Sequence, residues 1–353
     1  MAAAAFIAAT STPCAPTARR AEGARVWDSD GVARLDYDMG GGSIILGHAF
    51  GPVEAAVAAA APDATERAAG ALIDLLPCAQ AARFTAEEAQ ALPAAIAAAR
   101  VITGRRRALV WGPGSALLAD TTDMAALVLD PLGVPRAQLQ AARRLADDAG
   151  ALLIFDEGVC GLRVHDRGAQ GLNGILPDLA VHGAGIANGR PIGAIAGPRH
   201  LIAALDEDDL PEARPASLAA AAATLAHLTI APAAPDLRIL GAELQAEVAT
   251  LIDRAGAARF FALEGDPALP TPLFAAPQLE GLWLRETARQ GLIVFGPHGL
   301  SAAHGEAEVA RLVEAYAEIL PLMVANGLLE SLLRPVGPAV FSVMSASVAL
   351  SGN

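Results

Sequence analysis

The stretch ALLIFDEGVCGLRV, residues 151–164, decides how this chain folds. Its first five residues are continuously apolar, which is typical of a strand buried on both faces of a sheet. Asp156 and Glu157 follow at the end of that strand. Because the chemistry of a parallel sheet gathers at the carboxyl ends of its strands, this acid pair is the first candidate site. A carboxylate here can pair with a protonated ring nitrogen or a substrate cation, or it can cap a nearby helix.

Outward from that stretch, strand and helix patterns alternate. Residues 125–129, 179–182 and 192–196 are further short apolar runs, and residues 136–149 show the spacing of an amphipathic helix. This alternation predicts an α/β fold with a mostly parallel sheet covered by helices. Residues 26–37 predict a hairpin. After residue 232 the pattern changes to that of a smaller α+β unit. We therefore expect an N-terminal arm and hairpin over 1–50, a large domain over 51–232 and a small C-terminal domain over 233–353.

Composition excludes several classes of function. The 353 residues carry a formal net charge of −13, which argues against binding to nucleic acid or to anionic membranes. No window offers about 20 bulky apolar residues free of charges, so we expect no membrane span and a cytoplasmic location. The three cysteines and seven histidines show no metal-ligand spacing, and we expect no metal. All 25 basic residues are arginine, so no lysine is present to form a Schiff base.

The glycine-rich stretch HGAGIANGRPIG, residues 182–193, follows one of the predicted strands. It has neither a Walker lysine nor a GxGxxG arrangement. A turn-rich connection is the simpler interpretation, and phosphate binding is the alternative. His182, Asn188 and Arg190 bring polar groups to this stretch and are candidate site residues.

Four segments then stand out in order: VWDSDGVARLDYDMGGGSIILGH (26–48), ALLIFDEGVCGLRV (151–164), PDLAVHGAGIANGRPIGAIAG (177–197) and FGPHGLSAAHGEAEVARLVEAY (295–316). Together they resemble class III aminotransferases of the PLP-dependent fold type I superfamily, and especially glutamate-1-semialdehyde aminomutase and its relatives. The resemblance implies a PLP-transferase fold, with a large domain and a small α+β domain. It also implies a dimer with its active site at the subunit interface, and Asp156 as the acid that pairs with the pyridine nitrogen of the cofactor.

The departures from this family fall on residues that hold its cofactor. The resemblance places Ala184 at the Schiff-base lysine. It places Glu87 and Glu88 in the phosphate-binding segment, where carboxylates would repel a phosphate. Gly158 stands where a hydrophobic residue packs on the ring, and the aromatic–histidine pair expected near residues 112–115 is missing.

These departures predict a degenerate aminotransferase homologue, a pseudoenzyme without PLP-dependent transamination and with no cofactor expected. We expect it to serve as a non-catalytic subunit, paired with itself or with a catalytically competent paralogue. A second hypothesis is a repurposed cleft that binds a small metabolite without PLP, lined by Asp156, Glu157, His182, Asn188, Arg190, Glu87 and Glu88. An active PLP-dependent aminotransferase or aminomutase is the third and least favoured hypothesis.

Overall fold

The computed structural model of the protein describes residues 18–59, 61–112, 120–205 and 211–325. Its largest sheet has six strands in the order β4-β9-β8-β7-β6-β5. Strands β5 to β8 run parallel, whereas β9 is antiparallel to both of its neighbours. The strands are β4 (Ala81–Thr85), β5 (Arg107–Trp111), β6 (Met124–Leu129), β7 (Leu152–Glu157), β8 (Leu179–His182) and β9 (Gly193–Gly197). The predicted mostly parallel α/β sheet is confirmed.

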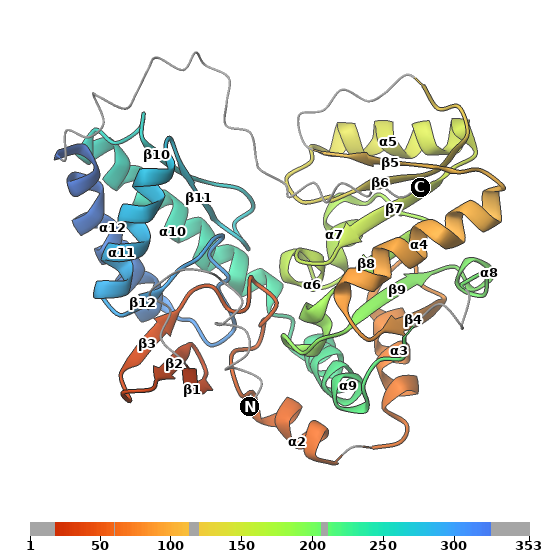
Figure 1. Ribbon diagram of the computed structural model, residues 1–353, viewed down its shortest axis with the longest axis horizontal. Coiled ribbons are helices and arrows are strands. Elements are labelled where there is room, and N and C mark those ends of the chain that lie inside the picture. Colours follow the sequence, from red (N-terminus) through yellow and green to blue (C-terminus); the bar gives the residue numbers. More distant parts are fainter. Residues whose placement is uncertain (1–17, 60, 113–119, 206–210, 326–353) are drawn as a thin grey trace.

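Helices cover both faces of this sheet (Figure 1). The small apolar face of α4 (Glu88–Thr103) packs against Val128, Ile154 and Val181. On the opposite face, α5 (Arg136–Ala149) packs against Leu127 and Phe155. Successive residues of a strand point to opposite faces, so strands covered on both sides must be apolar at every position. This explains the continuous apolar runs in the sequence.

Alanine-rich helices complete this lobe. Helix α9 (Pro215–Ile230) packs against α2 (Gly51–Ala59) and α3 (Ala64–Leu75). Short helices follow three of the strands and shape the ends of the sheet: α6 (Gly161–Val164) and α7 (Gly168–Asn173) after β7, η1 (Ala184–Ala187) after β8, and α8 (Arg199–Ile202) after β9.

The second lobe joins both ends of the described chain (Figure 1). The predicted hairpin is present as β2 (Arg25–Asp28) and β3 (Ala33–Asp36), flanked by β1 (Ala18–Glu22). Strand β3 pairs in parallel with β12 (Leu292–Ile293), which comes from the far end of the sequence. The other elements are α10 (Ala234–Ala255), β10 (Phe261–Glu264), β11 (Thr271–Phe274), α11 (Pro277–Arg289) and α12 (Glu306–Ala325). The domain boundaries themselves stay a prediction.

A buried arginine ties the two lobes together. The guanidinium of Arg163, in α6, is fully buried. Its Nε donates to the carbonyl of Gly42 (2.8 Å), and its Nη2 donates to the carbonyls of Gly42 and Ile44. Its Nη1 donates to the carbonyls of Ala268 and Leu300. One side chain of the large lobe thereby binds three separate segments beside the end of the sheet.

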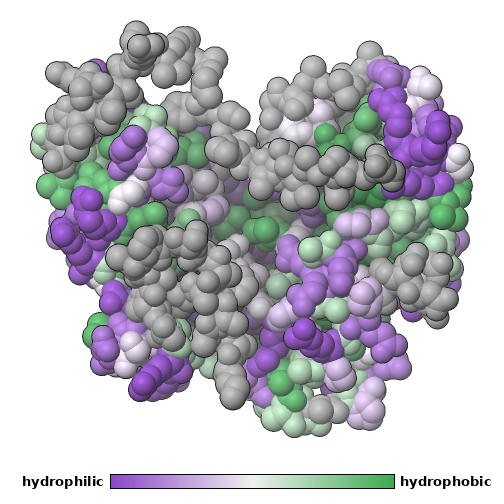
Figure 2. All heavy atoms as spheres, viewed as in Figure 1, coloured by the Kyte–Doolittle hydropathy of each residue, from purple (hydrophilic) through white to green (hydrophobic). Residues whose placement is uncertain are grey.

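Among the described helices, none is by itself long and apolar enough to span a membrane. Helices α9 and α10 together reach the length and composition, but they are bent by 77° relative to each other. Over the described part of the face in Figure 2, hydrophilic and hydrophobic residues are interspersed.

Candidate functional site

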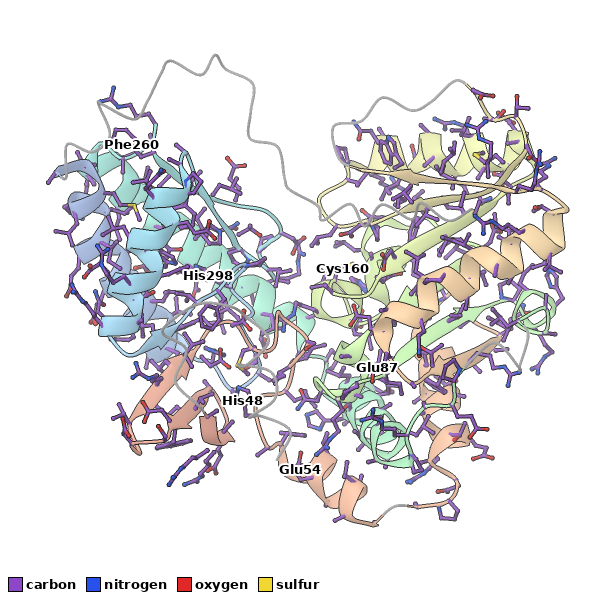
Figure 3. The ribbon with its side chains drawn as sticks, in the orientation of Figure 1. His48, Glu54, Glu87, Cys160, Phe260 and His298 are labelled. Atoms are coloured by element: carbon purple, nitrogen blue, oxygen red, sulfur yellow. The ribbon has the colours of Figure 1, made fainter. Side chains whose placement is uncertain are left out.

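The candidate site lies at the carboxyl ends of β7 and β8, on the side of the sheet that faces the second lobe. Glu87, at the start of α4, and Cys160, at the start of α6, both lie on this side (Figure 3). Asp156 and Glu157 are the last residues of β7, and His182 is the last residue of β8. In the parallel register, Glu157 lies opposite His182. The sheet therefore brings the predicted acids and His182 to one edge.

Asp156 and Glu157 point to opposite sides because they are successive residues of one strand. Asp156 is half-buried and accepts the Gly158 N–H (3.3 Å), and burial raises its pKa. Glu157 is 1% exposed and accepts the Ala169 N–H (2.6 Å) at the start of α7. Burial raises the pKa of Glu157 to about 7. Asp156 is therefore the accessible acid of the pair, and Glu157 caps a helix.

Glu88 reaches the same edge from the first residue of α4. Its Oε2 accepts the backbone N–H of Ala184 (3.1 Å), the residue that the resemblance places at the lysine position. Burial raises the pKa of Glu88, and the charge of Asp156 raises it further. The sheet order explains the approach, because α4 packs against β8 and leaves its N-terminus beside the loop after that strand.

Two glycines make room for this carboxyl group. A Cβ added at Gly158 would lie 2.8 Å from Glu88 Oε1, and one added at Gly183 would overlap the same carboxyl group. Such approaches are shorter than van der Waals contact. Glu88 thus occupies a slot between the loops after β7 and β8 that residues with larger side chains would close.

His182 and Asp130 extend the edge. His182 is 1% exposed, its Nε2 has no hydrogen-bond partner among the described residues, and burial lowers its pKa to about 4. The imidazole is therefore neutral. Asp130 directly follows β6; burial raises its pKa to about 6, and the charge of Asp156 raises it further. Sequence reasoning missed Asp130, although it shares with Asp156 the signal of an acid after an apolar strand.

The other predicted site residues are held elsewhere. Asn188 accepts the Leu46 N–H (2.9 Å) and donates to the Gly47 carbonyl (2.9 Å), which fastens an N-terminal loop to the end of η1. Arg190 forms an ion pair with Glu54 of α2 (2.9 Å). These contacts draw Asn188 and Arg190 toward the N-terminal segment.

Glu87 is exposed and forms an ion pair with Arg214, whose Nη2 lies 3.5 Å from Glu87 Oε1. It does not share the slot that holds Glu88. Residues 113–115 of the expected aromatic–histidine segment lie outside the described residues.

The residues fit a pyridoxal cofactor in one respect and not in two others. The Asp156 carboxyl group can receive a protonated ring nitrogen at the end of β7. Ala184 cannot form an imine, and the sequence holds no lysine that could replace it. Glu88 brings a carboxyl group to the segment that the resemblance assigns to the phosphate. The fit therefore supports ring recognition without covalent attachment.

Curated relatives share one name. The chain is 30% identical over 246 residues to glutamate-1-semialdehyde 2,1-aminomutase of Chloroflexus aggregans, and 32% identical over 243 residues to that of Desulfitobacterium hafniense. These alignments cover 52% and 51% of this chain, and the chain spans 56% of the length of each relative. The aminomutase of Gemmatimonas aurantiaca aligns over 86% of this chain and 88% of its own length, at 27% identity. No protein-family profile matches the chain.

Solved structures agree on the fold. A structure described as a transaminase with PLP bound superimposes with a TM-score of 0.79 and 25% identity, covering 93% of this chain and 94% of that one. A Sphingopyxis protein in its PLP internal aldimine form gives a TM-score of 0.78 at 24% identity, with 92% of each chain covered. The PLP-transferase fold is confirmed.

These comparisons contradict two predictions from the sequence, that of a pseudoenzyme or PLP-free repurposed cleft and that of a protein without cofactor. The named relatives are aminomutases, one similar structure is a transaminase with PLP bound, and another is a protein in its PLP internal aldimine form. A missing lysine removes one covalent bond to the cofactor, whereas the scaffold around the site does not depend on that bond. The chain is similar to proteins named glutamate-1-semialdehyde 2,1-aminomutase and has the PLP-transferase fold of a transaminase with PLP bound.

Proposed function

We propose that this chain is an aminotransferase- or aminomutase-type protein that binds a pyridoxal-derived cofactor, in its aldehyde or amine form, without a covalent bond. The observation that carries the proposal is the position of Asp156. Its carboxyl group is half-buried at the carboxyl end of β7, at one edge with Ala184 and the loop after β8. The similarity to a transaminase with PLP bound and to a protein in its PLP internal aldimine form supports the same class of cofactor.

Electrostatics favour a cationic ring at this point. Burial raises the pKa of Asp156, which means that its ionised form lacks compensation in the protein alone. A protonated ring nitrogen would supply that compensation and hold the carboxyl group ionised. When bound, the cofactor supplies a carrier for an amino group and a sink for electrons. Asp156, half-buried at the end of β7, would hold the proton on the ring nitrogen.

Pyridoxamine 5′-phosphate tests this function, because its amine cannot form an imine with the protein. Equilibrium dialysis, read by absorbance and fluorescence, measures its dissociation constant. We expect saturable binding that is reversed by further dialysis and leaves the protein mass unchanged. Replacing Asp156 by asparagine removes a charge-assisted hydrogen bond, worth roughly 1.5–3 kcal/mol, and should weaken binding about tenfold or more.

The matched control is Asp148→Asn, which makes the same change at an exposed position of α5. It should leave the dissociation constant unchanged. Binding that does not saturate, or binding that Asp156→Asn and Asp148→Asn affect equally, would overturn the proposed function.

We further propose that the chain acts as a dimer, with itself or with a lysine-bearing relative. The support for this is the family resemblance. Native mass spectrometry of the protein from its own cells separates the two forms, and a purely monomeric species would contradict both. A cytoplasmic location stays a prediction.

A further inference from the structure

Strand β5 forms an outer edge of the six-stranded sheet, and β6 is its one neighbour among the described strands (Figure 1). A strand at the edge of a sheet directs the N–H and C=O groups of alternate residues away from its neighbour, where another strand can bond to them. Parallel strands are normally covered on both faces, and β6 follows that rule, since it is buried at every position.

One face of β5 is covered and the other is not. On the face that α5 covers, Leu109 and Trp111 belong to the same apolar cluster as the buried side of that helix. On the opposite face, Val110 lies beside Val128 of β6, which α4 covers. Val110 itself is 75% exposed. The cover that α4 gives to the sheet therefore ends before β5.

The uncovered face continues onto the end of α4. Val101 and Ile102, in its last turn, are both exposed. Arg100 Nε donates to the Arg106 carbonyl (2.8 Å), which ties this turn to the start of β5. We call Val101, Ile102 and Val110 the β5 shelf. An apolar surface beside an open strand edge has the features of a site for strand addition, in which the backbone supplies the hydrogen bonds and the side chains supply the apolar contact.

The chain itself holds a segment that suits this surface. Beyond Ala325, where the described residues end, lies the run AVFSVMSASVAL, residues 339–350. It contains no charged residue, proline or glycine, and such uncharged runs rich in valine and other strand-forming residues pair readily with open edges. Residues 326–338, which precede it, span up to about 45 Å when extended. That reach exceeds the roughly 30 Å diameter of a small domain.

We propose that residues 339–350 of this chain pair with β5 as a further strand and cover the β5 shelf. A tethered segment suits this surface better than a second copy of the chain does. Strand β5 has five residues, and a contact of that length falls short of the roughly 1,200 Å² that a stable interface between proteins buries. A segment of the same chain needs less contact, because its effective concentration is in the millimolar range. The proposal does not depend on the proposed function.

Photo-crosslinking of the full chain tests the proximity. Val110→Cys carries a benzophenone group, the described cysteines Cys78 and Cys160 are buried, and Cys14→Ser removes the remaining thiol. We expect mass spectrometry to locate the crosslink within the proposed strand, in a product with the mass of one chain. Val32→Cys places the same group at an exposed valine of the second lobe, and this matched control should not crosslink to that strand.

Hydrogen exchange of the unlabelled full chain tests the pairing. We expect the amides of β5 that point away from β6 to exchange slowly, at a rate independent of protein concentration. Val343→Pro removes an N–H from the middle of the proposed strand and should speed their exchange about tenfold or more. Ser351→Pro, just beyond that strand, is the matched control and should leave the exchange unchanged.

Three results would overturn the docking of this segment: a crosslink to another part of the chain, fast exchange of the outward β5 amides in the wild-type protein, or exchange that Val343→Pro leaves unchanged. A crosslinked product with the mass of two chains, or protection that grows with protein concentration, would overturn it as well and identify a second copy as the occupant. No cofactor enters these measurements, so their failure leaves the proposed function standing.

Discussion

Two places near the end of the sheet bury charge in opposite ways. At the carboxyl edge, Glu88, Asp130, Asp156 and Glu157 all have raised pKa values, with burial as the largest cause in each. A few residues further along the chain, burial lowers the pKa of Arg163 to about 10. A buried acid can relieve its burial by taking up a proton near neutral pH, whereas this arginine stays charged there.

The difference explains the surroundings of each group. Arg163 needs permanent compensation, and it obtains it from backbone carbonyls of three segments. The acids need less compensation of their charge, because they can take up a proton. The carboxyl edge of the sheet therefore retains groups whose charge changes with pH and with ligands. The candidate site and the structural arginine Arg163 thus lie close together. They differ because a buried carboxyl group can lose its charge near neutral pH, whereas a buried guanidinium cannot.

The largest effect is expected at the tie. Arg163→Met keeps much of the volume but leaves the buried carbonyls of Gly42, Ala268 and Leu300, and the part-buried carbonyl of Ile44, without their donor. Unsatisfied buried groups cost about 1–3 kcal/mol each, and we expect a loss of roughly 3–5 kcal/mol in the free energy of unfolding. Urea denaturation measures it. The side chain of Arg285 is 58% exposed. Arg285→Met should therefore lower the free energy of unfolding by less than about 1 kcal/mol. Equal losses of unfolding free energy in Arg163→Met and Arg285→Met would show that the buried hydrogen bonds of Arg163 do not stabilise the fold.

An intermediate effect, dependent on pH, is expected at Glu157. Its pKa rises from 4.5 in the unfolded chain to about 7 in the folded protein. Between these values the folded state holds a proton that the unfolded state has lost, so this group lowers the free energy of unfolding as pH rises from 4.5 to 7. The change is on the order of 3 kcal/mol.

Glu157→Gln is uncharged at every pH and should therefore gain stability relative to wild type across that range. Denaturation midpoints of the two proteins at several pH values measure the difference, in which the titration of other groups cancels. A difference that does not change with pH would show that burial of Glu157 carries no such cost.

The smallest effect on the free energy of unfolding is expected at Arg190, which is partly exposed and paired with Glu54. The side chains of Arg190 and Glu54 are 24% and 48% exposed. Partly exposed ion pairs contribute about 0–1 kcal/mol, so Arg190→Met should change the free energy of unfolding by no more than that. A double-mutant cycle with Glu54→Gln isolates the pair. A coupling energy well above about 1 kcal/mol would show that Arg190, like Arg163, stabilises the fold.

Much of the scaffold could be predicted from the sequence. Apolar runs of strand length followed by polar residues predicted β7 and β8 and placed Asp156 and His182 at their ends. This worked because a strand buried on both faces has no alternative to a continuous apolar run. The hairpin before residue 37 followed from its turn residues in the same way.

The candidate site was predicted only in part. Asn188 and Arg190 are close in sequence to Ala184, yet the fold directs both toward the N-terminal segment. The absence of lysine was correctly observed, but it was given too much weight. It excludes one covalent bond to a cofactor, and two structures with the same fold contain PLP.

By itself, the sequence determined the local helices and strands, because these depend on residue type and spacing. It also excluded an imine to a lysine side chain, because the chain contains no lysine. Only the tertiary structure decided which groups meet. The start of α4 lies beside the ends of β7 and β8, and this brings the carboxyl group of Glu88 to Ala184. The fold also surrounds Arg163 with carbonyls from distant segments. Such meetings depend on how helices pack across a sheet, and the order of residues along the chain does not contain that information in any local pattern.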